Sequence, residues 1–147
     1  MWEHTYVTKV LLETGASLSA VDNDGRTPLH LSVRWHYTDV TKILLEAGAS
    51  LSVVDNDGRT PLHLSARWEH RDVTNVLLEA GASLSVVDND GWTPLHLSAK
   101  WGHIDVTKVL VEAGASPSAV DNDVIKPSVK LRKSNIKLLK FHMRNVI

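Results

Sequence analysis

The sequence contains no cysteine and no long apolar run, and these absences exclude several kinds of protein. Without cysteine the chain has no disulfide framework, no thiol chemistry and no thiolate metal site, so it fits a reducing compartment. No apolar stretch approaches the roughly 18 residues of a membrane span, and residues 1–12 lack the basic region and long apolar run of a signal peptide. We therefore expect an intracellular protein, cytoplasmic or nuclear.

Aromatic residues are also scarce, and the few that occur are unevenly chosen. One Phe and two Tyr stand against five Trp. Four of the five Trp recur every 33 residues, at Trp2, Trp35, Trp68 and Trp101. A period of about 20–50 residues indicates a unit that cannot bury its apolar face alone and is stable only when it stacks on copies of itself.

The net charge of −1 conceals two oppositely charged parts of the chain. Residues 1–123 carry 9 basic and 17 acidic residues, a net charge of −8, whereas residues 124–147 carry 7 basic residues and no acid. We interpret residues 120–147 as a degenerate, basic C-terminal cap of the stack. The alternative is a basic segment that contacts nucleic acid or anionic membrane. Because it has only seven cations and no interleaved aromatic residues, we favour the structural cap and do not expect nucleic acid or membrane as the partner.

The 33-residue period is clearest in Asp-Asn-Asp-Gly, one further residue, and Thr-Pro-Leu-His-Leu-Ser, which begins at Asp22, Asp55 and Asp88. Asp-Asn-Asp-Gly is a turn sequence, because Gly accepts positive φ and Asp and Asn side chains bond nearby amides. We expect a hairpin-like finger there. Thr-Pro starts a helix, because the hydroxyl caps free amides and Pro at the first helical position loses no hydrogen bond. The pattern predicts a short helix from Pro61 to about Trp68.

A second helix of the same unit is predicted to begin near Asp72, whose charge complements the helix dipole. Apolar residues then recur at i, i+3, i+4 and i+7 and form one stripe: Val73, Val76, Leu77 and Ala80. Gly81 ends this helix as a left-handed cap. Each unit is therefore a turn, a helix, a turn and a helix.

These residues, Asp-x-x-Gly-x-Thr-Pro-Leu-His-Leu and then Leu-Leu-Glu-Ala-Gly-Ala, closely resemble the ankyrin repeat. The resemblance covers three full units, at residues 21–53, 54–86 and 87–119, and residues 1–20 align with the second half of a unit. It implies an all-α solenoid of antiparallel helix pairs with short β-hairpin fingers, in which residues 1–147 form a single ankyrin-repeat domain. It also implies a concave face made of the fingers and the first helices.

The chain departs from the ankyrin pattern in two ways. The family often has Gly after the first helix, where this chain has Glu3, His36 or Glu69 and keeps only Gly102. If that position is left-handed, a side chain there costs roughly 1 kcal/mol. Thr and Ser also replace the usual Val and Ala, which predicts more polar packing and a somewhat weaker stack. These residues are Thr8, Thr41, Thr74, Thr107, Ser32, Ser65 and Ser98.

The repeated histidines and aspartates are candidates for chemistry, but we interpret them as structural. His30, His63 and His96 each end Thr-Pro-Leu-His, and the resemblance implies that the imidazole bonds backbone groups of the adjacent turn. Asp-Asn-Asp-Gly is similar to the opening of a calcium loop, but no copy has the Glu expected at its end. No phosphate loop, nucleophile elbow or dinucleotide fingerprint occurs. We therefore predict a non-catalytic protein without metal, cofactor or small-molecule substrate.

The resemblance places the binding residues on the finger and at the end of the first helix, and stacking turns each position into a ladder. The predicted binding residues are Trp35, Trp68 and Trp101, then Arg34, Arg67 and Lys100, then Arg26, Arg59 and Trp92, with Asp57 and Asp90 on the fingers. Trp and Arg are the residues most enriched at binding hot spots. We predict that they bind a protein partner. The alternative is that the Trp pack under the next unit or stack on neighbouring Arg side chains.

The truncated first unit leaves apolar surface open where solenoids normally carry a polar cap. Three readings stay open at this point: the N-terminus frays, the chain is a piece of a longer array, or two chains cover each other's open ends. The last of these predicts self-association through the first unit.

Overall fold

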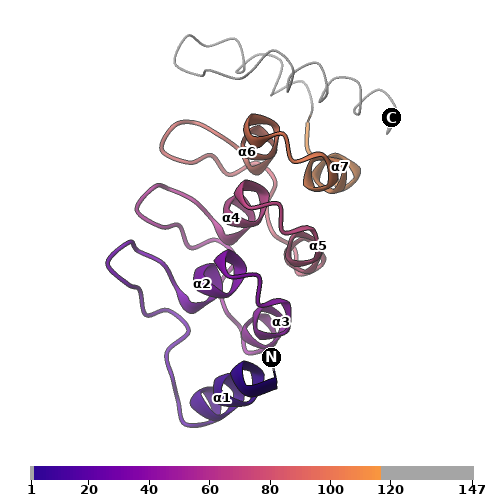
Figure 1. Cartoon of the computed structure of the whole chain (residues 1–147). Helices are drawn as coiled ribbons and strands as arrows, with labels where there is room; N and C mark the ends of the chain where they lie inside the picture. The colour runs from indigo at the N-terminus through magenta and orange to yellow at the C-terminus, as the bar shows by residue number, and fades with distance from the viewer. Residues whose placement is uncertain (1, 117–147) are drawn as a thin grey trace.

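The fold is a stack of short helices in two columns (Figure 1). The computed structural model describes residues 2–116, which contain seven α-helices and no β-strand. The inner column consists of α2 (Pro28–Arg34), α4 (Pro61–Arg67) and α6 (Pro94–Trp101). The outer column consists of α1 (Trp2–Glu13), α3 (Thr38–Glu46), α5 (Arg71–Glu79) and α7 (Ile104–Glu112). The all-α repeat solenoid expected from the sequence is confirmed.

Some predictions concern residues that the structure does not describe. The basic C-terminal cap at residues 120–147, and the alternative of a basic segment for nucleic acid or membrane, lie outside the described residues. Among residues 2–116, none of the helices combines the length and the apolar character needed to cross a membrane.

Each inner helix begins with the same Thr-Pro-Leu-His arrangement. Thr60 is the N-cap of α4, and its hydroxyl oxygen accepts from the backbone N–H of His63 while Pro61 occupies the first turn. The side chain of His63 reaches back to the N-cap backbone, so that one pair of residues satisfies two otherwise free amides. The same capping box starts α2 and α6.

The outer helices of the full units, α3, α5 and α7, bury an apolar stripe, as the sequence predicted. In α5, Val73 and Leu77 are completely buried, while Ala80 is the exposed C-cap and lies at the edge of the stripe. Gly81 directly follows this C-cap, and its φ of +95° is the left-handed conformation expected there.

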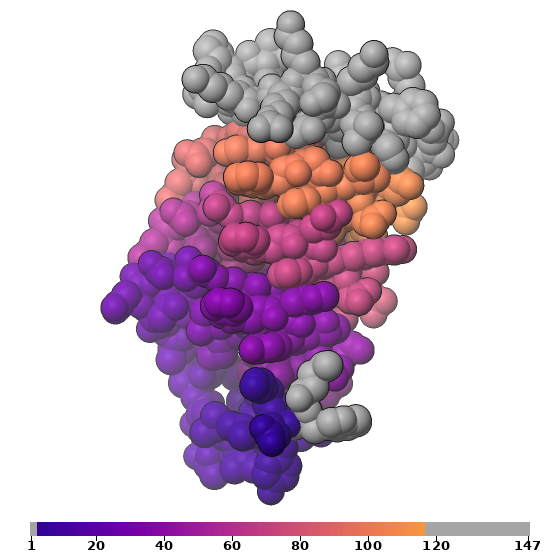
Figure 2. Space-filling view, in the orientation of Figure 1, coloured from indigo at the N-terminus to yellow at the C-terminus, as the bar shows by residue number. Residues whose placement is uncertain are grey.

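The units stack directly on one another, and their apolar side chains form one continuous core along most of the stack. Figure 2 shows the units as successive layers, from indigo to orange. Val33 of α2 packs in the same cluster as Leu64, Val73 and Leu77 of the next unit, and the cluster continues into the third unit. Each unit thus completes the core of its neighbour, as expected for a solenoid.

Polar pairs lie inside this core where the sequence has Ser and Thr in place of Ala and Val. The Oγ1 atom of Thr74 on α5 lies 2.9 Å from the Oγ atom of Ser65 on α4, and both side chains are fully buried. Thr41 with Ser32 and Thr107 with Ser98 repeat this contact at 2.9 Å. The more polar packing predicted from the sequence is therefore present. Its Ser and Thr hydroxyl groups form a hydrogen bond between the two helices of each full unit.

The fingers are turns without a β-strand among the described residues, so the β-hairpin form expected for them is not observed. In the second finger, the Asp55 carboxylate accepts the backbone N–H groups of Asp57 and Arg59, each at 2.9 Å. Asp55 also donates its own N–H to the Arg59 carbonyl at 2.9 Å. The loop is closed by this Asx-type turn instead of a strand ladder.

The residue after the first helix is left-handed in all three full units. Gly102 has φ +70°, and the two non-glycine residues at this position, His36 and Glu69, have φ +59° and +58°. The conformation suspected from the sequence is therefore present, and His36 and Glu69 bear its steric cost.

Candidate interaction surface

The three tryptophans that follow the inner helices are exposed, not core residues. Trp35 is 61% exposed, Trp68 47% and Trp101 48%, whereas Leu29, Leu62 and Leu95 of the same helices are at most 2% exposed. Trp35 and Trp68 are the C-caps of α2 and α4, and Trp101 is the last residue of α6. Each of the three full units therefore has a large apolar side chain at the C-terminal end of its inner helix.

Cationic side chains alternate with these indoles. The guanidinium of Arg34 lies 5.5 Å from the ring centroid of Trp35, and that of Arg67 lies 5.4 Å from Trp68. Arg67 also lies 5.6 Å from the ring of Trp101 in the next unit. Lys100 continues the series, with its ammonium 5.7 Å from Trp101. We call these six residues (Arg34, Trp35, Arg67, Trp68, Lys100 and Trp101) the tryptophan–cation ladder.

The ladder lies next to the fingers. The ammonium of Lys100 is 5.0 Å from the ring of Trp92, a finger residue. Desolvation lowers the pKa of Arg67, and the charges of Arg59 and Asp57 in the neighbouring finger also act on it. The ends of the inner helices and the fingers therefore contribute to one surface.

The third predicted ladder lies mostly beneath the fingers. The side chains of Arg26 and Arg59 are only 20% and 15% exposed, and each pairs with an acid of its own finger, Asp24 at 2.8 Å and Asp57 at 3.4 Å. Trp92 is 8% exposed and belongs to the hydrophobic core. The structure thus corrects the expectation for Trp92, because a buried indole is not available as an anchor.

The predicted finger acids are accessible, and the fingers are tied to one another. The carboxylate of Asp57 is 64% exposed, and Asp90 is also exposed. Between fingers, Asn89 donates its side-chain amide to the Asn56 carbonyl at 2.9 Å and its N–H to the Asp57 carbonyl at 3.0 Å. Asn56 makes the same two bonds to the first finger. This row of hydrogen bonds fixes the spacing of the exposed acids.

The repeated histidines make backbone hydrogen bonds through both ring nitrogens. Nδ1 of His63 accepts the N–H of Thr60 at 3.1 Å, so Nε2 carries the proton and donates to the carbonyl of Trp92 at 2.8 Å. His30 bonds Thr27 and the Arg59 carbonyl in the same way. Burial lowers the pKa of both histidines, which favours this neutral form. They join the helix start of one unit to the finger of the next.

His70 and His103, which follow the inner helices, also join units. Nε2 of His70 lies 3.2 Å from the carbonyl oxygen of Arg34, and Nε2 of His103 lies 2.8 Å from that of Arg67. Each imidazole therefore holds the end of the preceding inner helix. Within residues 2–116, no group of three or more His, Asp or Glu side chains is placed to hold a metal ion.

The sequence pattern identified the exposed Trp and the cations beside them, but not the contacts between units. That Arg67 lies against Trp101 depends on how far one unit is displaced from the next, which a single repeat does not specify. The burial of Trp92 was missed for a similar reason. Its position carries Arg in the other two units, which suggested a charged, exposed position. Arg and Trp share a long apolar part, however, and this part can pack under the finger.

Comparison with known protein families finds two matching family models. The model described as "Ankyrin repeats (3 copies)" matches residues 47–121, and the model described as "Ankyrin repeats (many copies)" matches residues 11–65. A comparison with curated proteins gave no match.

Proposed function

Because the chain belongs to the ankyrin-repeat family, whose repeats generally mediate protein–protein interaction, we propose that it is a non-catalytic scaffold that binds a protein partner through the concave face. The proposed contact residues are those of the tryptophan–cation ladder together with the exposed finger acids Asp57 and Asp90. Arg26 and Arg59 take a supporting role, because their side chains hold the finger acids.

The observation that supports this proposal best is the exposure of the three ladder indoles. A Trp side chain offers a large apolar area for burial by a partner, and Trp and Arg are the residues most enriched at binding hot spots. Trp68 is 47% exposed although it lies 5.4 Å from Arg67. The cation–π contact orients the indole and leaves half of its surface available to a partner.

The charges of this surface indicate the kind of partner that would fit. Arg34, Arg67 and Lys100 place a cation in each unit, while the neighbouring fingers carry exposed acids. A partner segment that presents acidic side chains to the ladder and basic side chains to the fingers would match both. Since the ladder is nearly identical from unit to unit, a partner whose own surface repeats fits it best.

The proposal is tested by capturing partners from a cell lysate with the intact chain and with the Trp68→Ala/Trp101→Ala variant. We expect the wild-type chain to retain a protein that the double variant loses, with an unchanged circular dichroism spectrum. The matched control is Tyr6→Ala/Val7→Ala, which removes two exposed apolar side chains from α1 (71% and 53% exposed) and should keep the same protein. Equal capture by all three chains would refute the assignment.

A further inference from the structure

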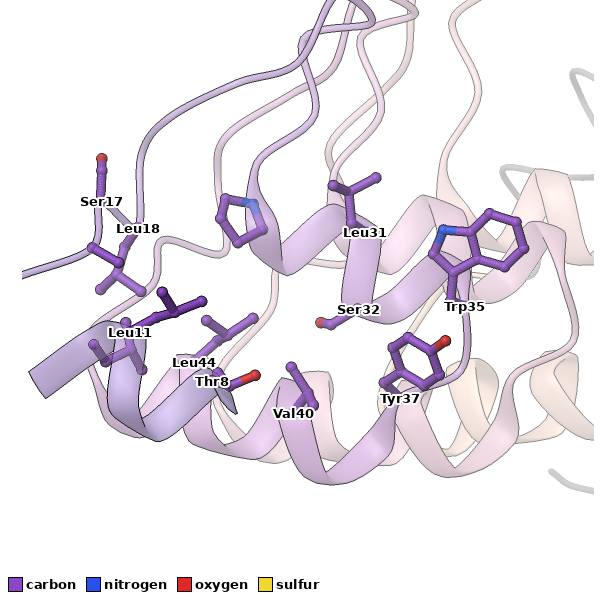
Figure 3. A pocket seen from close by; sticks show the side chains of 13 residues that line it. Thr8, Leu11, Ser17, Leu18, Leu31, Ser32, Trp35, Tyr37, Val40 and Leu44 are labelled. Atoms are coloured by element: carbon purple, nitrogen blue, oxygen red, sulfur yellow. The ribbon is translucent and has the colours of Figure 1, made fainter. Parts of the chain in front are cut away.

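A second surface lies at the N-terminal end of the stack, where an apolar groove runs between α1 and α2 (Figure 3). Its volume is about 280 Å³, and no charged side chain lines it. Leu11 and Thr8 face it from α1, Leu31 and Trp35 from α2, and Val40 from α3.

The next unit has the same groove, but there it is filled. Leu11 is 52% exposed, whereas Leu44, its equivalent 33 residues later, is 4% exposed. Leu31 and Val40 are partly exposed, whereas their equivalents Leu64 and Val73 are 4% and 0% exposed. The groove residues are thus core residues of this fold that lack a covering element within residues 2–116.

The repeats of the chain themselves show what fills such a groove. In the unit of residues 21–53 the filling element is the inner helix α2. Its Leu29 packs with Leu44 and Ala49 of the same unit, and its Val33 packs with Leu64 and Val73 of the next unit. An occupant must therefore be a short helix with apolar side chains at positions i and i+4.

Polar groups of the first finger, next to the groove, fit the same occupant. Asp88 pairs with Arg59 of the preceding finger at 3.6 Å, whereas its equivalent Asp22 is exposed and has no ion pair among the described residues. Asn56 and Asn89 donate their amides to the preceding finger, whereas the side-chain amide of Asn23 has no acceptor within residues 2–116. A finger ahead of Asp22 would offer Asn23 the backbone acceptor that Asn56 and Asn89 have. An arginine placed as Arg59 is would also reach Asp22, although among the described residues Arg26 makes no such pair with Asp55.

Two further positions fit the helix that would follow such a finger. The carbonyl of Arg59 accepts from His30, so the equivalent carbonyl of Arg26 is placed to accept from an incoming histidine. Trp35 lines the groove and is 61% exposed, and an arginine at the end of the incoming helix would reach it as Arg67 reaches Trp101.

We propose that this groove binds a segment of a partner protein that has a finger of the Asp-x-x-Gly-Arg type followed by a Thr-Pro-Leu-His-Leu-Ser-type helix. The segment would lie beside α1 as α2 lies beside α3. Charge complementarity favours it, because its finger arginine would face Asp22 as Arg59 faces Asp88. A second copy of this chain is a poorer donor, since Leu29, Leu62 and Leu95 of its own inner helices are at most 2% exposed and already packed.

The test measures binding of a fluorescent synthetic peptide with the sequence of residues 21–35 to the intact chain, by fluorescence anisotropy up to millimolar chain concentration. We expect saturable binding that weakens at least ten-fold with Leu11→Asp in the chain, and also with the peptide that carries Leu29→Asp. Leu11→Asp should fold, because Leu11 is half exposed, and circular dichroism checks this. Val87→Asp, at a 54% exposed valine outside the groove, is the matched control and should bind the peptide normally.

Three results would overturn this proposal. The first is no saturable binding of the wild-type peptide. The second is binding that neither aspartate substitution weakens, since the groove would then not be the site. The third is a chain that is dimeric by light scattering without peptide and monomeric with Leu11→Asp, because a second copy would then be the occupant. None of these results affects the function proposed for the tryptophan–cation ladder, which lies on the other units as well.

Discussion

The guanidinium of Arg67 lies 5.6 Å from the ring centroid of Trp101, which belongs to the next unit of the stack. The same guanidinium lies 5.4 Å from Trp68 in its own unit. One arginine therefore joins two indoles, and the spacing of the exposed tryptophans is coupled to the stacking of the units. This arrangement brings onto one surface residues that are separated by 33 positions in the sequence.

Replacing Glu69 by glycine should stabilise the protein. Glu69 has φ +58°, a left-handed conformation that costs a side chain about 1 kcal/mol or more. Its carboxylate is half exposed and lies 3.3 Å from His103, a contact worth little at the surface. Because glycine also loses more entropy on folding, we expect the free energy of unfolding in urea to rise by about 0.5–1 kcal/mol.

The matched control for that substitution is Gly102→Ala, which puts a side chain on the equivalent residue at φ +70°. It should lower the free energy of unfolding by about 1 kcal/mol. A stabilising Gly102→Ala, or a destabilising Glu69→Gly, would show that backbone strain does not decide stability at this position.

The buried side chains of Ser65 and Thr74 should be energetically coupled, which a double-mutant cycle measures. Ser65→Ala or Thr74→Val alone removes one partner of a buried hydrogen bond and should cost about 1–2 kcal/mol in urea unfolding. The double substitution replaces both hydroxyls by apolar groups and should be close to neutral. These values give a coupling energy of about 2 kcal/mol or more, and strictly additive effects would mean that the 2.9 Å contact contributes nothing.

Stability should fall on mild acidification. Burial lowers the pKa of His30 and His63 in the folded protein, so below the ordinary histidine pKa of about 6.5 the unfolded chain binds more protons. The contribution of the neutral imidazoles is therefore complete above pH 7 and is lost as the pH falls below about 6.5. Each histidine adds a slope of up to about 1.4 kcal/mol per pH unit.

Urea unfolding at several pH values between 7.5 and 5.5 measures this slope. The variant His63→Gln should unfold at lower urea concentrations but show a shallower dependence on pH, because one buried imidazole with a lowered pKa is gone. A wild-type stability that stays constant or increases on acidification would contradict the assignment of neutral, backbone-bonded histidines.

Much of this architecture could be predicted from the sequence, because each local signal agrees with the repeat. Thr60 and Pro61 start α4 as expected, and Gly81 ends α5 with the expected positive φ. The fingers were predicted less well. Asp-Asn-Asp-Gly specifies a turn, but whether strands flank it depends on pairing between residues that the tetrapeptide does not determine. The observed loop is closed by the Asp55 carboxylate, and no strand is present among the described residues.

The candidate surface was predictable only in part. The period shows that Trp35, Trp68 and Trp101 occupy equivalent positions, but not whether those positions are buried. Trp92 illustrates the difference, because it carries the same side chain and lies in the core. The groove at α1 was foreseen as open apolar surface. Asp22 and Asn23 belong to the first finger, and the sequence does not show that their equivalents Asp88 and Asn56 contact the preceding finger.

The central claim is that the exposed indoles of the tryptophan–cation ladder bind a partner and do not hold the stack together. Its most direct test is the dissociation constant of the captured partner for the wild-type chain and for Trp68→Ala/Trp101→Ala, measured by calorimetry beside the free energy of unfolding. We predict an affinity at least about 30-fold weaker, equivalent to about 2 kcal/mol, with a change in the free energy of unfolding below about 1 kcal/mol. An unchanged affinity, or a variant that loses its helical circular dichroism spectrum, would contradict the account.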